Sequence, residues 1–210
     1  MTDGSLGAFA VVGICGSLRK GSFNRALLNA AQGLAPAGMV IETIEIGALP
    51  FFNADLEVEG DPPAVAAFKR QIETADGVLI ATPEYNDGVP GVLTNAIDWA
   101  SRLPGRAPLT LKPVALMGAS LSQVGTARAQ AHLRQMLSHA NARTLPPPEL
   151  LVALAQSKFD ANLALIDPGT TTVLTLLLQR FARWILRERA AREAEASFTQ
   201  AGIERRRGAA

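Results

Sequence analysis

A loop rich in glycine and polar groups, residues 16–24, holds the side chains best suited to bind an anion. It follows a short apolar run, Phe9–Cys15, and precedes a helical pattern that begins near Ala26. Such a strand, loop and helix point backbone N–H groups and the positive end of the helix at an anion. The loop adds two hydroxyls, one amide and one guanidinium, from Ser17, Ser22, Asn24 and Arg19. The sequence therefore predicts a phosphate site here.

Comparison with two common glycine patterns narrows the class of phosphate-containing ligand that the loop could bind. The dinucleotide pattern G-x-G-x-x-G fails, because Gly13 and Gly16 are three apart and the third glycine is missing. The P-loop pattern is half matched by Gly16 and Gly21, but Ser22 stands where that pattern needs lysine. A triphosphate would lack its main counter-charge, whereas a monophosphate suits the hydroxyls, the amide and Arg19.

Alternating strand and helix patterns must position this loop. The apolar runs and their breakers predict strands at 9–15, 39–46, 77–82 and 113–119, and a broken fifth strand at 143–145 and 149–154. After the first helix, further helices are expected at 63–74, 91–102, 125–140 and 170–195, and a long irregular loop at 47–63. This alternation indicates an α/β protein with a doubly wound parallel sheet. Ligands then bind beyond the carboxyl ends of the strands, where three loops gather, at 16–24, 82–90 and 118–124.

Composition limits the classes of protein that remain. The chain has 210 residues, 48% of them apolar, and a net charge of +1, which gives no sign of nucleic-acid binding. The lone Cys15 excludes an internal disulfide and suits a reducing compartment, so we expect a cytoplasmic location. Neither a signal peptide nor a membrane span is visible. We expect a single domain over residues 1–200 and a disordered tail over 201–210.

Two motifs in order carry a family resemblance. Residues 16–24 read Gly-Ser-Leu-Arg-Lys-Gly-Ser-Phe-Asn, and residues 82–86 read Thr-Pro-Glu-Tyr-Asn. Val89-Pro90-Gly91 and the run from Asn95 to Trp99 follow. Together they resemble the NAD(P)H-dependent FMN reductases, close to the branch of bacterial chromate and quinone reductases. The resemblance covers residues 9–150 and weakens toward 186.

The resemblance implies a flavodoxin-like fold, with three α/β/α layers and a five-stranded parallel sheet of order 2-1-3-4-5. It also implies a set of FMN-binding positions in three groups. Ser17, Arg19, Ser22 and Asn24 would hold the phosphate, and Leu18 and Phe23 would line the same loop. Pro83, Glu84, Tyr85 and Asn86 would border the isoalloxazine, and Ser120 would touch the flavin or the ribityl chain from the other side. Asp87-Gly88 departs from the family, which often has a larger or basic residue there.

The chain offers no acid, base or nucleophile set of its own, and no metal site. His132 and His139 are seven apart on one expected helix, with no cysteine or carboxylate cluster nearby. A bound cofactor that carries the redox chemistry would explain this. The resemblance implies hydride transfer from NAD(P)H to the N5 atom of FMN. Quinones, flavins, azo compounds or metal oxyanions such as chromate would then be reduced in a second half-reaction.

Several alternatives stay open from the residues alone. The protein could be a flavodoxin-type electron carrier, although such carriers are usually acidic, or a flavin-binding protein without turnover. Glu84 could cap the segment that follows it, and Tyr85 could be a surface aromatic. Asp98 and Arg102, four apart on a helix, predict a surface ion pair. A homodimer or homotetramer is expected from the resemblance only.

Overall fold

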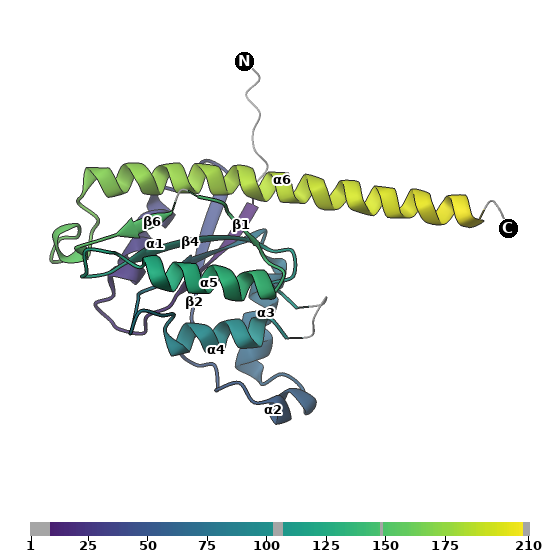
Figure 1. Cartoon of the computed structure of the whole chain (residues 1–210), viewed down its shortest axis with the longest axis horizontal. Helices are drawn as coiled ribbons and strands as arrows, with labels where there is room; N and C mark the ends of the chain where they lie inside the picture. The colour runs from purple at the N-terminus through teal and green to yellow at the C-terminus, as the bar shows by residue number, and fades with distance from the viewer. Residues whose placement is uncertain (1–8, 103–106, 148, 208–210) are drawn as a thin grey trace, which may run out of the picture.

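A parallel sheet forms the centre of the protein (Figure 1). The computed structural model describes residues 9–102, 107–147 and 149–207. The strands pair in the order β2-β1-β3-β4-β5, and β6 also pairs with β4. Their bounds are β1 Phe9–Cys15, β2 Met39–Ile44, β3 Gly77–Ala81, β4 Pro113–Ala119, β5 Arg143–Thr144 and β6 Leu150–Val152. The predicted order 2-1-3-4-5 is confirmed, and every pairing is parallel.

The broken fifth strand is also confirmed. β5 pairs with the start of β4, where Pro113 faces Arg143, and β6 pairs with its end, where Met117 faces Leu150. The segment between them contains Pro146 and Pro147. Proline has no N–H to give to a ladder, so the strand stops there and resumes beyond it.

Helices cover both faces of the sheet, because its central strands are apolar on both sides. β3 and β4 are buried at every residue. α1 (Phe23–Gly33) and α6 (Pro168–Arg207) share one core with the sheet. The opposite core takes side chains from α3 (Pro63–Thr74), α4 (Gly91–Ala100) and α5 (Ala127–His139). The result is the predicted three-layer α/β/α arrangement.

One segment expected to be irregular is partly helical. Within residues 47–63, a short helix, α2, runs from Ala54 to Val58. The side chain of Asn53 accepts a hydrogen bond from the backbone N–H of Asp55, which satisfies one free donor at the helix start. A short 3-10 turn, Ala155–Ser157, follows β6.

The last helix is longer than the predicted range of 170–195. α6 runs from Pro168 to Arg207 and projects beyond the sheet (Figure 1). Residues 187–201 are mostly alanine, arginine and glutamate, which favour helix, and contain no proline. An ion pair of 2.6 Å between Arg189 and Asp76 ties this part of the helix to the sheet. Among the described helices, none combines the length and hydropathy that crossing a bilayer requires.

Candidate functional site

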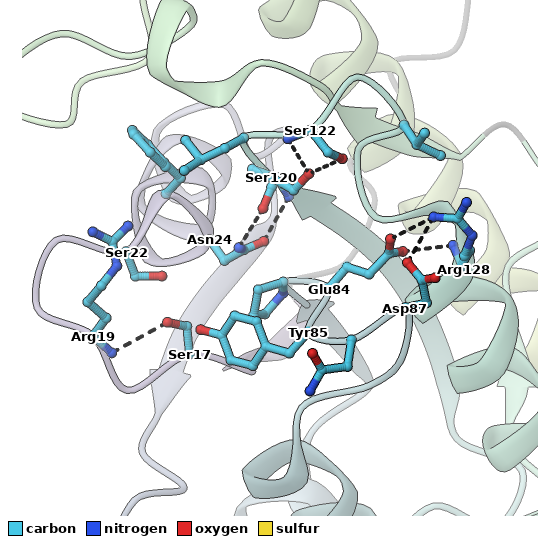
Figure 2. Close-up of a pocket in the computed structure, with 16 residues that line it drawn as sticks. Ser17, Arg19, Ser22, Asn24, Glu84, Tyr85, Asp87, Ser120, Ser122 and Arg128 are labelled. Atoms are coloured by element: carbon cyan, nitrogen blue, oxygen red, sulfur yellow. Dashed lines mark hydrogen bonds and ion pairs between the residues drawn. The ribbon is translucent and has the colours of Figure 1, made fainter.

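A cavity of about 610 Å³ opens at the carboxyl ends of β1, β3 and β4 (Figure 2). It is where the sequence placed the site, at the meeting point of loops 16–24, 82–90 and 118–124. All the predicted binding residues line it except Leu18. The full lining is Ser17, Arg19, Ser22, Phe23, Asn24, Pro83, Glu84, Tyr85, Asn86, Asp87, Ala119, Ser120, Leu121, Ser122, Val124 and Arg128. The Leu18 side chain is exposed and lies near Gly47, outside this lining.

The loop after β1 is held in a fixed shape. The Gly16 N–H donates to the Ala81 carbonyl at 2.8 Å, which ties the loop to the end of β3. Ser17 Oγ accepts a hydrogen bond from the Arg19 N–H at 3.4 Å. Ser22 is the N-cap of α1, and its Oγ accepts from the Arg25 N–H at 3.3 Å. Both serines are buried, and both line the cavity.

Arg19 brings a positive charge to this end of the cavity. Its guanidinium lies 5.7 Å from the centroid of the Phe23 ring. Phe23 is itself packed on Phe159, with 5.4 Å between ring centroids. Within the described ranges, no carboxylate forms an ion pair with Arg19. The charge therefore stays available to an anionic ligand.

Asn24 has a structural role that the sequence did not show. Its amide nitrogen donates to the Ala119 carbonyl, and its amide oxygen accepts from the Ala119 N–H, each at 2.9 Å. The side chain is buried. Asn24 thus links the first turn of α1 to the end of β4 (Figure 2), and the phosphate contact expected for it stays a prediction.

The loop after β3 contains a tight turn. Tyr85 and Gly88 exchange two backbone hydrogen bonds, of 3.1 and 3.0 Å. The two residues between them, Asn86 and Asp87, have φ angles of 50° and 60°. Asparagine and aspartate tolerate this left-handed region better than most residues, and their order before Gly88 suits a type I′ turn. The half-exposed Tyr85 ring lies between Ser17 and Glu84 in Figure 2.

Glu84 binds a helix terminus. Its Oε2 accepts hydrogen bonds from the Arg128 and Ala129 N–H groups, both at 2.9 Å. These are free donors of the first turn of α5, where a negative charge is stabilised. Glu84 therefore caps a helix, and its contact with a flavin stays a prediction. The capped helix is α5, however, and not the segment that follows Glu84.

Arg128 forms a side of the cavity that was not predicted from the sequence. Its Nη1 lies 2.9 Å from Asp87 Oδ1 and 3.6 Å from Glu84 Oε1. Ser120 Oγ donates to the Gly125 carbonyl at 2.7 Å and lies 2.8 Å from Ser122 Oγ, which folds the loop after β4. Loop 118–124 was predicted to lie at this edge of the sheet. Arg128 is in the first turn of the helix that follows this loop, so its position next to the loop could have indicated that it lines the cavity.

One prediction about charged groups also has an outcome. Arg102 does not pair with Asp98. It binds the Glu57 carboxylate through Nε at 3.0 Å and Nη2 at 2.9 Å, and these hydrogen bonds raise the pKa of Arg102. Burial raises the pKa of Asp98. Among the described residues, no group of three potential metal ligands gathers.

The cavity has two chemically different parts. Ser17, Arg19 and Ser22 lie on one side in Figure 2, next to the N-terminus of α1. The rest of the lining includes Pro83, Tyr85, Leu121 and Val124, which offer apolar and aromatic surface. A molecule with a phosphate at one end and a flat ring at the other fits this division.

Known proteins resemble this chain in sequence, and a solved structure resembles it in fold. A family model described as NADPH-dependent FMN reductase matches residues 9–157. An NAD(P)H-dependent FMN reductase of Pseudomonas aeruginosa is 48% identical over 179 residues, which cover 85% of this chain and 96% of that protein. A quinone reductase of Escherichia coli K12 is 44% identical over 180 residues, covering 84% and 95%. A solved flavoenzyme NAD(P)H:(acceptor) oxidoreductase of Paracoccus denitrificans has a TM-score of 0.79 and 35% identity, with 86% and 99% of the chains covered.

Proposed function

The chain belongs to the NADPH-dependent FMN reductase family, and from this we propose that it is an FMN-dependent enzyme that uses NAD(P)H to reduce quinones. The observation that carries the proposal is the cavity at the carboxyl ends of β1, β3 and β4. At one end lies Arg19, which pairs with no carboxylate among the described residues, and elsewhere Pro83, Tyr85 and Leu121 add apolar and aromatic surface. Relatives of 44% and 40% identity are named quinone reductase and 2-hydroxy-1,4-benzoquinone reductase.

The phosphate of FMN would lie against loop 16–24. Ser17, Arg19 and Ser22 line this end of the cavity, and α1 begins there, directly after its N-cap Ser22. A hydrogen bond to a charged group contributes about 1.5–3 kcal/mol, so several of them anchor a phosphate firmly. Asn24 would act indirectly, since it fixes α1 against β4.

The isoalloxazine ring would lie along Pro83, Tyr85 and Asn86, with Leu121 and Ser120 on the side of the loop after β4. When bound, FMN would supply the redox chemistry, which is hydride transfer from NAD(P)H to the quinone. The protein's part is to bind and orient. Tyr85 provides a flat surface at the mouth, and Glu84 keeps α5 in position through its two hydrogen bonds.

The acceptor can be proposed more widely. On the family resemblance, we include free flavins, azo compounds and metal oxyanions such as chromate as candidate acceptors. The expectation of a homodimer or homotetramer rests on the family resemblance.

The first test is spectroscopic. The purified protein should be yellow, and anaerobic addition of NADPH should bleach the flavin within seconds. Steady-state turnover with a simple benzoquinone should follow ping-pong kinetics, because both substrates use one site in turn. A flavin that stays oxidised under NADPH would refute the enzyme proposal and favour an electron carrier.

The second test concerns the phosphate. We expect Arg19→Ala to weaken FMN binding about 10- to 100-fold, as the loss of one charge-assisted hydrogen bond implies. Lys20→Ala is the matched control, because Lys20 is an adjacent exposed cation that does not line the cavity. Titration of each FMN-free variant with FMN gives the dissociation constants. Equal affinities for the two variants would contradict the assignment of the phosphate to loop 16–24.

A further inference from the structure

A second groove, of about 460 Å³, lies between α6 and the chain that follows β5. It shares no lining residue with the cavity described above. Three arginines of α6 form its basic side, namely Arg180, Arg183 and Arg187. The apolar side consists of Leu145 and Pro146 after β5, and Leu176 and Trp184 of α6.

The three arginines carry charge that no described carboxylate neutralises. Within the part of the chain that the structure describes, none of them forms an ion pair with a carboxylate. Their basic neighbours are paired, since Arg134 binds Glu149 at 3.1 Å and Arg143 lies 3.7 Å from Glu188. Like charges three and four residues apart on a helix repel one another. An anion in the groove would relieve this repulsion.

The aromatic part of the groove is held in place. The half-buried Trp184 donates its indole N–H to the Arg143 carbonyl at 2.8 Å, which fixes the ring against β5. The Arg187 guanidinium lies 5.9 Å from the centroid of this ring. A basic surface that only contacts water does not need apolar side chains beside it. The combination of three arginines with an apolar and aromatic surface therefore indicates a ligand with both an anionic and an apolar part.

We propose that this groove binds a small molecule that carries a di- or triphosphate and an aromatic ring, of which a nucleoside diphosphate is the simplest class. A guanidinium group binds a phosphate through two parallel N–H···O hydrogen bonds. The seven-residue spacing from Arg180 to Arg187 spans about 10 Å along the helix, which is longer than one phosphate group. The apolar surface of Trp184 and Pro146 would take the ring. The proposal does not depend on the reaction at the other cavity.

The test measures binding of ADP to the FMN-loaded protein by calorimetry. The variant is Arg180→Gln combined with Arg183→Gln, because glutamine keeps the helix propensity and removes both charges. Arg70→Gln is the matched control, since Arg70 is an exposed helical arginine of α3 outside both sites. We expect saturable binding to the wild type and to the control, at least tenfold weaker binding to the double variant, and no binding of adenosine. Quinone reduction and the thermal midpoint should stay unchanged in the double variant.

Three results would overturn the proposal. No saturable binding of ADP at millimolar concentration would show that the groove is only a solvated face. Binding that is equal in the wild type and in the double variant would place ADP elsewhere, for example over the flavin. Binding to phosphatidylserine vesicles that depends on Arg180 and Arg183, without binding of ADP, would make this face a lipid-binding surface instead.

Discussion

Replacement of Asn24 by alanine tests whether this side chain holds the protein together or holds the cofactor. Its amide makes two hydrogen bonds of 2.9 Å to the backbone of Ala119, and it is 3% exposed. Asn24→Ala leaves both backbone groups of Ala119 without their partner. We therefore expect the FMN-free protein to lose stability, because the interaction is present before any ligand binds.

The size of the loss follows from three contributions. Each buried polar group left without a partner costs about 1–3 kcal/mol, so the two groups of Ala119 cost about 2–6 kcal/mol. Ala119 borders the cavity, and water can enter there to satisfy part of the loss. Alanine also favours helix by about 0.5 kcal/mol over asparagine. The expected net loss is about 2–4 kcal/mol, or a fall in the thermal midpoint of at least about 4 °C.

The assay is unfolding of the FMN-free protein in urea, followed by circular dichroism. Asn29→Ala is the control, because Asn29 lies on the exposed side of the same helix and its side chain has no hydrogen bond within the described ranges. Its stability should change by less than about 0.5 kcal/mol. If Asn24→Ala is as stable as Asn29→Ala without FMN, and differs only in FMN affinity, then the structural role is wrong and the predicted phosphate contact is right.

Three further predictions concern packing and pH. Gly118→Ala should lower stability by about 1–3 kcal/mol in urea unfolding, because its new methyl group would overlap Thr126, whereas Gly91→Ala meets open space and should be neutral. Burial lowers the pKa of Lys112 to about 8 from 10.5, so between these values the unfolded chain binds more protons and stability rises with pH. Lys112→Met should remove that rise, and parallel pH profiles for the two proteins would contradict it. Hydrogen bonds lower the pKa of Asp167 to about 2 from 3.8, so its stabilising effect is lost as the pH falls through that range; Asp167→Asn should flatten the acid limb of the stability profile.

The sequence determined most of the fold. β1 and β4 begin and end where the apolar runs do, at Phe9–Cys15 and Pro113–Ala119. Apart from Ala10 in β1, both strands are buried on two faces, so an unbroken apolar run is what the fold requires of them. α3 begins at Pro63 because proline suits the first turn of a helix. These signals are local. The parallel arrangement of the strands follows from the regular alternation of strands and helices along the chain.

The sequence also located the candidate site, because parallel strands bring the loops at their carboxyl ends together. Loop 16–24 lies at that edge, and so does Tyr85. The local turn at Asn86 and Asp87 follows from residue types that tolerate a positive φ. The role of each side chain at that edge could not be predicted as well, because several of these side chains bind other groups of the protein.

Tertiary structure decided those partners. Glu84 binds the start of a helix 44 residues further along the chain, and Asn24 binds a strand end 95 residues away. Arg102 binds Glu57 from a distant segment, although Asp98 is only four residues away, because α4 ends at Ala100 and Arg102 lies beyond it. A local pattern gives the chemical type of a side chain and the element that holds it. The partner depends on which distant groups the packed layers bring within about 3 Å, and only the folded arrangement of β4, α1 and α5 sets those distances.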